Sequence, residues 1–530
     1  MGRILDINDP LVEWRLQTRL CHISTLPSEL LLEVFHLLTF DVRAPNVVPA
    51  TLSHVSMLWR DLVLHAAELW TKVLVVEDLG PDVVAFRKTI DRVQFFLSQS
   101  AAHALDMHIE LRTYYDNYVM ENAEHPFYNT IDQFRECARS ISKSLAPHIW
   151  RIKSFYLDCD EFKSISDIQG SFQVVPMKML EVLRVRQAFE EQSFENFLDD
   201  DTEGAAILVP LGSRCVEEDM YPRLRSAVLA TIPLDWGRFC PKNLHTLEIS
   251  FFSMEARPDG KTLRQILLAN EHSLESLTIH GASPVDRVMA PYVMSKLRHL
   301  DLGYAYPSEL VHLVECMRVP NLTTLHIIDL RRSLSCATER RYLHYSHATS
   351  ILFQAIINEL PLHQVERLEL RHISLMPEVG LLPWYPEVQI VPNLSHLPIP
   401  ITALDFLCRL TGLESLTIAS PDPGILHALN YLPPPIKPCG LFNDSQFTHV
   451  PVPALKSLHL MDFNLPLVRF FLAIRRSRCY CFRRLHSLTF GMPATWMLNF
   501  DLLLFLAHGV ERFDTILEPC MEKDLITPLY

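Results

Sequence analysis

The chain has 530 residues, of which 48% are hydrophobic and 21% charged, and its formal net charge is -14. This length exceeds the roughly 250 to 300 residues that one hydrophobic core serves, so we expect several modules or a repeat array. The acidic balance argues against nucleic acid as a partner, which would need clustered Lys and Arg, and no run approaches the roughly 20 apolar residues that cross a membrane.

Residues 1–20 are interpreted as an N-terminal tail without a secretion signal. The stretch MGRILDINDPLVEWRL alternates apolar and acidic residues, and it lacks the continuous apolar region and cleavage site of a signal peptide. We therefore expect an intracellular location, cytoplasmic or nuclear.

A short leucine-rich helix is predicted next. Thr25 can cap this helix, Pro27 suits its first turn, and Glu29 lies near the positive end of the helix dipole. At 100° per residue, a stripe of about 140° contains four apolar residues that we expect in a core, namely Leu31, Val34, Phe35 and Leu38. Leu32 and Leu37 fall outside this stripe, and their surplus apolar surface suggests a partner.

A second amphipathic helix is predicted over TLSHVSMLWRDLVL, after a loop containing Pro45 and Pro49. Its expected buried stripe consists of Leu52, Val55, Leu58, Trp59, Leu62 and Val63. The following ELWTKVLV is typical of a strand, and Trp70 is placed to close the bottom of the helical unit. Together these elements predict a helical module over residues 21–78.

Residues 79–149 are predicted to form a connector of helix, strand and helix. FRKTIDRVQFFLSQS indicates the first helix, ALDMHIEL the strand, and IDQFRECARSISKSL the second helix. This connector leads into the remaining part of the chain, residues 150–530.

One short pattern recurs along residues 150–530. A leucine-like residue, two others, a second leucine-like residue, one other and a third form segments that begin at Ile152, Leu180, Leu244, Leu274, Leu297, Leu322, Val365, Leu413, Leu455 and Leu485. From Leu244 to Leu322 the spacings are 30, 23 and 25 residues, close to those of leucine-rich repeats. Later spacings of 43, 48 and 42 residues imply insertions.

The pattern predicts an irregular leucine-rich-repeat-like domain. Each unit would make one short strand whose alternating apolar side chains face the interior, and the next segment would return as a helix or loop to cover them. The expected fold class is therefore an α/β solenoid with a curved parallel sheet, preceded by the helical module. Leucine-rich strands also occur in other α/β proteins, and the asparagine that follows the strand in regular repeats is mostly absent here.

No catalytic site is recognisable in the sequence. No phosphate loop, dinucleotide fingerprint, nucleophile elbow or paired-histidine zinc motif occurs. Cys479 with Cys481, and His344 with His347, are the best metal candidates, yet neither pair has a second ligand pair at recognisable spacing. We expect no metal and no cofactor, and we interpret the acidic segment 189–204 as a solvated excursion.

The stretches LPSELLLEVFHLL and LSHVSMLWRDLVLHAAELWTKV together resemble the F-box, especially that of fungal proteins in which repeats follow the box. The shared pattern is Leu-Pro, an acidic residue, an aliphatic run ending in Val-Phe, then a Val and a Trp in a second helix, and a later Trp. The link from Thr39 to Ala50 departs from the family, because it is longer and richer in proline.

The resemblance implies docking onto the small adaptor subunit of a Skp, cullin and F-box ubiquitin ligase. By position, the family signature falls on Leu26, Pro27, Leu30, Leu31, Val34, Phe35, Leu38, Leu52, Val55 and Trp59. It further implies a non-catalytic subunit that holds a Skp-type adaptor, and through it a cullin, while the repeats bind an unknown target protein.

Two other interpretations stay open. The leucines of the helical module would all pack internally if the module were only a structural subdomain. Alternatively, the chain is a leucine-rich-repeat scaffold or interaction protein that binds the adaptor or another protein without a ubiquitin-ligase role. An enzyme is a third possibility, for which no residue is singled out.

Overall fold

The structure is a computed structural model of the chain. It describes residues 23, 26–41, 47–79, 83–113, 127–159, 162–169, 176–187, 220–232, 234–250, 256–284, 290–330, 346–373, 375, 401–419, 425, 428–429, 451–461, 487–492 and 512–517. These residues belong to two compact units. The first consists of Met1–Ala188 with Ser213–Arg223, and the second of Phe189–Gly212 with Leu224–Tyr530.

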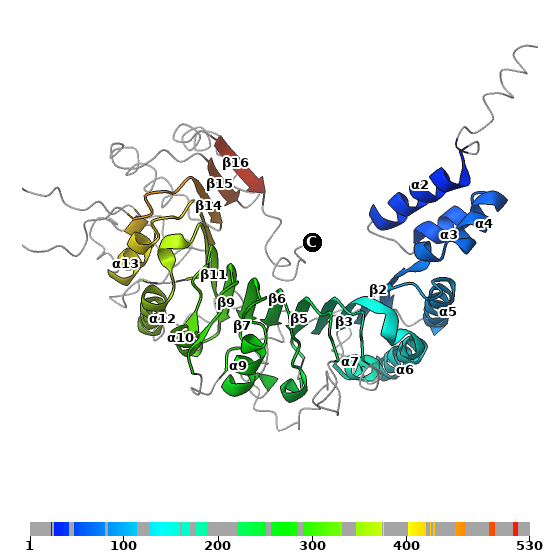
Figure 1. Ribbon diagram of the computed structural model, residues 1–530, viewed down its shortest axis with the longest axis horizontal. Coiled ribbons are helices and arrows are strands. Elements are labelled where there is room, and N and C mark those ends of the chain that lie inside the picture. Colours follow the sequence, from blue (N-terminus) through cyan, green and yellow to red (C-terminus); the bar gives the residue numbers. More distant parts are fainter. Residues whose placement is uncertain are drawn as a thin grey trace, which may run out of the picture. The chain divides into compact units, whose positions relative to one another are not determined.

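The first unit combines short N-terminal helices with a parallel sheet (Figure 1). Its helices are α2 (Ser28–Asp41), α3 (Val47–Ser53), α4 (Met57–His65), η2 (Ala67–Trp70), α5 (Val83–Gln99), α6 (Phe127–Leu145), η3 (Ala146–Arg151) and α7 (Phe162–Gln169). Its strands are β1 (Lys72–Leu79), β2 (Leu105–Thr113), β3 (Ile152–Cys159) and β4 (Val182–Gln187). The four strands lie in chain order and are all parallel, so the sheet runs across residue 150, where the sequence suggests a boundary.

The second unit repeats the same arrangement over more strands. The strands of its sheet are β5 (Ser226–Ala230), β6 (Thr246–Ser250), β7 (Ser276–His280), β9 (His299–Tyr304), β11 (Thr324–Asp329), β12 (Arg367–Arg371), β13 (Ser415–Ala419), β14 (Ser457–Met461), β15 (Ser487–Met492) and β16 (Arg512–Leu517). They too follow one another in chain order and are parallel. A small separate pair consists of β8 (Tyr292–Val293) and β10 (Met317–Arg318).

Helices cover one side of the second sheet (Figure 1). They are η5 (Trp236–Arg238), α9 (Gly260–Leu268), α10 (Pro307–Cys316), α12 (Ser346–Glu359), η8 (Leu362–Gln364) and α13 (Ile401–Arg409). Neighbouring helices pack through aromatic rings, as where Phe353 of α12 meets Phe406 of α13 edge-on with centroids 4.9 Å apart. In the first unit, α5, α6 and α7 likewise lie on one side of the sheet.

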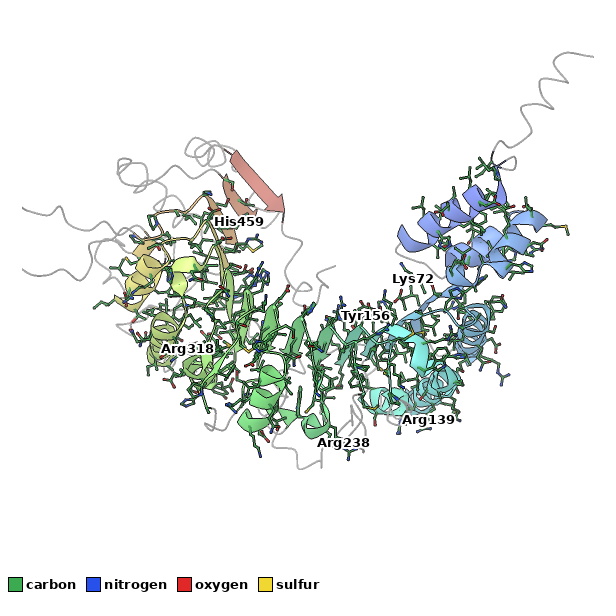
Figure 2. The ribbon with its side chains drawn as sticks, in the orientation of Figure 1. Lys72, Arg139, Tyr156, Arg238, Arg318 and His459 are labelled. Atoms are coloured by element: carbon green, nitrogen blue, oxygen red, sulfur yellow. The ribbon has the colours of Figure 1, made fainter. Side chains whose placement is uncertain are left out.

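Ladders of apolar side chains join each sheet to its helices. In the second unit, one ladder in exact register contains Leu247, Leu277, Leu300, Leu325, Leu368, Leu416 and Leu458, all of them buried. Alternation along a strand sends these residues to one face and the intervening polar residues to the other. We call the side of each sheet opposite its helices the open face. In Figure 2, Tyr156 of β3 lies on the open face of the first sheet, whereas Arg139 of α6 lies on the helical side.

The predicted strands are largely present. Every one of the ten segments that carry the leucine pattern contains a strand, and the two helices and the strand of the connector are α5, α6 and β2. The described chain therefore has an α/β fold with a large parallel sheet, as expected. β5 and β16 are strands that the pattern did not identify, because alanine or threonine stands at one of their apolar positions.

Two predictions about the helical module are wrong. The loop expected from Thr39 to Ala50 is largely helical, since α2 extends to Asp41 and α3 begins at Val47 with Pro49 in its first turn, where proline needs no donor. The single helix expected from residue 51 to 64 is two helices, α3 and α4. Ser56 begins the second one, because its hydroxyl accepts a hydrogen bond from the Trp59 amide at 3.2 Å.

None of the described helices is long and apolar enough to span a membrane.

Candidate protein-docking surfaces

A small core holds α2, α3 and α4 together. Leu31 and Phe35 of α2 are fully buried, and they share the interior with Leu52 of α3 and Val63 of α4. The Phe35 ring lies 4.8 Å from the ring of Trp59, in a tilted arrangement that aromatic pairs favour. The module thus has an interior of its own, although it is only three helices thick.

Trp70 connects this module to the sheet of the first unit. Its buried indole Nε1 donates a hydrogen bond to the Val63 carbonyl at 2.8 Å, near the end of α4. Its ring meets Phe96 of α5 edge-on, with centroids 4.9 Å apart. These contacts with α4 and α5 confirm the prediction that Trp70 closes one end of the helical module.

Many large apolar side chains of the module remain exposed. They are Leu26, Leu30, Leu37, Leu38, Val55, Met57, Leu58 and Leu64, which we call the exposed apolar set. Met57 is 78% exposed and Leu37 is 67% exposed, so these side chains make few internal contacts. Exposed apolar residues that occur singly need no explanation, but eight within one short module indicate a surface that binds another molecule.

The ten signature residues divide between the core and this surface. Leu31, Phe35 and Leu52 are buried, and Val34 and Trp59 are half-buried. The exposed members are Leu26, Pro27, Leu30, Leu38 and Val55. Half of the signature therefore stabilises the module, and the other half is available to a partner.

Helical periodicity placed several of these side chains on the wrong side. Leu38 was expected in the core but is 42% exposed, and Val55 and Leu58 are 57% and 47% exposed. The break at Ser56 explains the last two, because it resets the rotation of α4 relative to α3. Met57 and Leu64 were not singled out, and the Ser56 cap is the sequence signal that could have revealed them.

Charged side chains accompany the exposed apolar set. Glu29 and Glu33 on α2 are exposed, and His36 Nε2 lies 3.3 Å from Glu68 Oε1, which links α2 to η2. Such a mixture of apolar and polar groups is typical of protein interfaces, whose polar rim surrounds an apolar centre.

The open face of the second sheet is a second candidate surface. Its central row, read across neighbouring strands, contains Glu248, Thr278, Asp301, His326, Glu369, Thr417 and His459. All seven are half-buried. Sequence periodicity predicts that these positions are polar, but it does not predict which of them interact.

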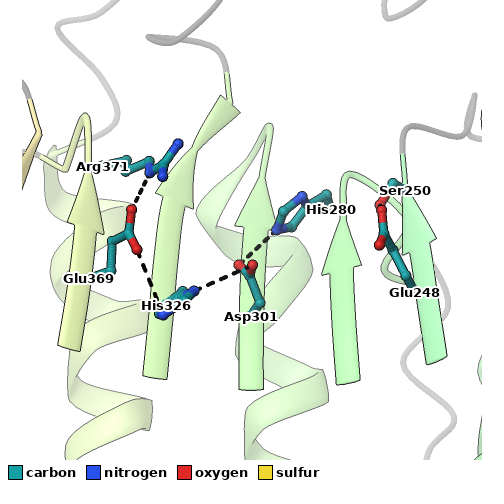
Figure 3. Close-up of polar contacts among 7 residues, drawn as sticks. All are labelled: Glu248, Ser250, His280, Asp301, His326, Glu369 and Arg371. Atoms are coloured by element: carbon teal, nitrogen blue, oxygen red, sulfur yellow. Dashed lines mark hydrogen bonds and ion pairs between the residues drawn. The ribbon is translucent and has the colours of Figure 1, made fainter. Parts of the chain in front are cut away.

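Three residues of this row, Asp301, His326 and Glu369, form one polar network with His280 and Arg371 (Figure 3). His280 Nε2 lies 2.7 Å from Asp301 Oδ1, and His326 Nδ1 lies 3.6 Å from Asp301 Oδ2. The other nitrogen of His326 lies 3.7 Å from Glu369 Oε2, and Arg371 Nε donates to the second oxygen of Glu369. The network therefore extends across β7, β9, β11 and β12.

The network shifts the protonation of its members. Burial raises the pKa of Asp301, but attraction to His280 and hydrogen bonds from His280 and His326 outweigh it and hold the pKa well below its usual range. Burial lowers the pKa of His326. Hydrogen bonding to Asp301 and the charges of Asp301 and Glu369 raise this pKa by more than burial lowers it, so the net shift is upward. A doubly protonated His326 can donate to both carboxylates, whereas the neutral ring can donate to only one.

The open face of the first sheet carries a smaller set of planar side chains. The rings of His108 on β2 and Tyr156 on β3 lie 5.7 Å apart, and Arg186 of β4 pairs with Asp158 at 2.9 Å. Burial lowers the pKa of His108 despite the nearby Glu110, so this imidazole is neutral at neutral pH. These residues can contact a partner but offer no nucleophile.

No metal-binding cluster is present among the residues that the structure describes. The metal candidates Cys479, Cys481 and His344, together with the cap Thr25 and the acidic segment 189–204, lie outside the described residues. His347 is the second residue of α12.

Comparison with known proteins adds no assignment to this geometry. No family model matches the chain, and no curated protein matches it either.

Proposed function

We propose that this chain is a substrate-recruiting F-box subunit of a Skp-cullin-F-box type ubiquitin ligase. In this proposal the helical module binds a Skp-type adaptor, and through it a cullin, while the second unit binds a target protein. The chain itself would be non-catalytic, and it would act by holding the target close to the enzyme that transfers ubiquitin.

The observation that carries the proposal is the division of the F-box signature into a buried and an exposed half. A module that served only structure would bury its leucines, whereas Leu26, Leu30 and Val55 are exposed here. Burial of a leucine or valine at an interface contributes roughly 1.5 to 3 kcal/mol. Several such side chains together therefore suffice for a stable complex without any catalytic group.

The sheet of the second unit supports a more specific proposal about the fold. We propose that it is an irregular leucine-rich-repeat-like solenoid, in which each unit contributes one parallel strand. The support comes from the ladder that begins at Leu247 and ends at Leu458, and from the order of the strands, which follows the chain. A solenoid of this kind presents a long strand face to a partner.

A capture experiment with purified adaptor and cullin tests the proposal. The wild-type chain should retain both proteins, and the triple variant Leu26→Ala, Leu30→Ala, Val55→Ala should lose them, because its three altered side chains are exposed. The matched control is Val293→Ala with Ile401→Ala, which removes equally exposed apolar groups from the second unit. Calorimetry should show that all three proteins unfold at similar temperatures.

The result that would sink the proposal is wild-type chain that captures neither adaptor nor cullin. Equal capture by the triple variant would contradict the assignment of the exposed apolar set. Capture of the adaptor without the cullin would instead favour the second candidate function, a scaffold or interaction protein without a ligase role. The polar open face of the second sheet supports the ligase subunit and the scaffold equally, because both would use it to bind a partner protein.

A further inference from the structure

We infer that the open face of the second sheet, around β9, β11 and β12, binds an acidic segment of a partner protein. The inference deepens the proposed function, since that segment would belong to the recruited target. The partner is identified by its chemistry alone, as an extended stretch rich in Asp and Glu side chains.

The two carboxylates in the centre of this face already have partners within the network. Both oxygens of Asp301 lie against histidines, and both oxygens of Glu369 lie against His326 and Arg371 (Figure 3). Their side chains are only 26% and 17% exposed. A partner protein therefore meets carboxylates that are half-buried and already in contact with His280, His326 or Arg371.

The guanidinium groups around that centre are, by contrast, available. Arg371 uses only Nε on Glu369, so its two terminal nitrogens have no partner among the described residues, and the carboxylate fixes the plane of the fork. Arg367 lies four residues before Arg371 on the same face of β12 and is exposed. No described carboxylate lies within ion-pair distance of Arg367, which leaves two arginines of one strand to bind an anion.

The positive field extends to the neighbouring strands. His299 of β9 lies in register with Thr324 of β11, which in turn pairs with Arg367. Burial lowers the pKa of His299, and repulsion from Arg367, His326 and Arg298 lowers it further against the opposing attraction of Glu275. His299 therefore lies within the positive field of Arg367, and both side chains are exposed.

Two exposed acids border this region, and the whole chain is acidic. Glu275 precedes β7 and Glu366 precedes β12, so a partner's carboxylates would bind toward the side of Arg367 and Arg371. The net charge of -14 belongs to the whole chain. Charges farther away than about 8 Å are largely screened at physiological salt, so the local guanidinium groups decide which partner binds. The net charge of the whole chain therefore does not determine the charge of the partner that this face binds.

Fluorescence anisotropy with the full chain tests the inference. The probe is a short labelled peptide of alternating Glu and Ser, compared with peptides in which Gln or Lys replaces Glu. The Glu peptide should bind most tightly, and added salt should weaken it. Arg367→Gln with Arg371→Gln should weaken it about tenfold, the sum of two exposed ion pairs. Arg409→Gln, an exposed arginine of α13 on the helical side, is the matched control and should bind as the wild type does.

Arg367→Gln alone is the second variant, because Arg367 does not touch the network and its loss should leave the fold intact. Equal binding of the Glu and Gln peptides, tighter binding of the Lys peptide, or unchanged affinity of both arginine variants would overturn the inference. Adaptor capture should be unaffected in every arginine variant. If the chain captures the adaptor but does not bind the Glu peptide, only this inference is contradicted. If it binds the Glu peptide but does not capture the adaptor, the inference holds and the proposed ligase function is contradicted.

Discussion

Arg151 Nη1 lies 3.0 Å from the Ser100 hydroxyl, so a guanidinium just before β3 closes the end of α5. The same group donates to the carbonyls of Leu97 at 2.9 Å and His103 at 2.8 Å. Carbonyls at a helix C-terminus lack partners within the helix. Arg151 is fully buried and satisfies them from a distant part of the sequence.

Arg151→Met should therefore lower the free energy of unfolding of the first unit by about 3 kcal/mol, because it removes at once the hydrogen bonds of a buried guanidinium to Leu97, Ser100 and His103. Urea unfolding followed by circular dichroism measures this change. Arg139→Met, on the surface of α6, is the control and should change it by less than about 1 kcal/mol. Equal effects of the two substitutions would contradict the capping role.

The strands were the most predictable part of this fold. A strand needs only alternation over a few residues, and the ten leucine patterns carry that information locally. The pattern also predicts burial outside the strands. Leu274 precedes β7 and is fully buried, as its position in the repeat predicts. β5 escaped because Ala227 stands where leucine was sought, although it is equally buried.

The candidate surfaces were predictable only in part. A surplus of leucine was evident on the first helix, but Leu38 and Val55 are exposed because of how α2, α3 and α4 pack, which a 100° count does not include. The polar network was not predictable at all. His280 and Asp301 are 21 residues apart and meet only because their strands are neighbours in a particular register.

Trp70→Phe should destabilise the junction between the helical module and the sheet. Phenylalanine keeps the contact with Phe96 but loses the hydrogen bond to the Val63 carbonyl, which would remain buried without a donor. We expect a loss of about 1 to 2 kcal/mol in the free energy of unfolding. The matched control is Trp150→Phe, since Trp150 makes a similar bond to the Pro147 carbonyl while 48% exposed. A larger effect at Trp150 would contradict this assignment.

Gly303→Ala should disturb the network, because a Cβ atom there would lie 2.8 Å from the His280 ring. Either the ring leaves Asp301 or the strand shifts, and we expect a cost of about 1 to 3 kcal/mol. Calorimetry measures the change in the unfolding midpoint of the second unit. Gly237→Ala is the control, since its added Cβ would meet only Asp235 Oδ1 at an ordinary 3.5 Å. Indistinguishable midpoints for the two variants would show that His280 yields without cost.

The protonation of His326 should make the stability of the second unit depend on pH. Asp301, His299, Glu369 and Arg371 are the charged or titratable groups that face it, and the carboxylates raise its pKa in the folded state. Its contribution is therefore fully present below the unfolded pKa and is lost as pH rises through the folded pKa. Asp301 behaves oppositely. Its folded pKa is lowered, so its contribution is present above the unfolded pKa and is lost only as pH falls through the folded pKa.

His326→Gln should consequently cost more stability near pH 6 than near pH 8, because the stabilising contribution of the wild-type ring is lost as pH rises through its raised folded-state pKa. The difference should stay below about 1 kcal/mol, because the side chain is 35% exposed and solvent screens its pairs. Calorimetric midpoints of wild type and variant at both pH values measure it. His272→Gln is the matched control, since His272 is 84% exposed beside Glu271 and should show no such difference. An equal cost of His326→Gln at both pH values would mean that its two carboxylate neighbours do not hold the proton.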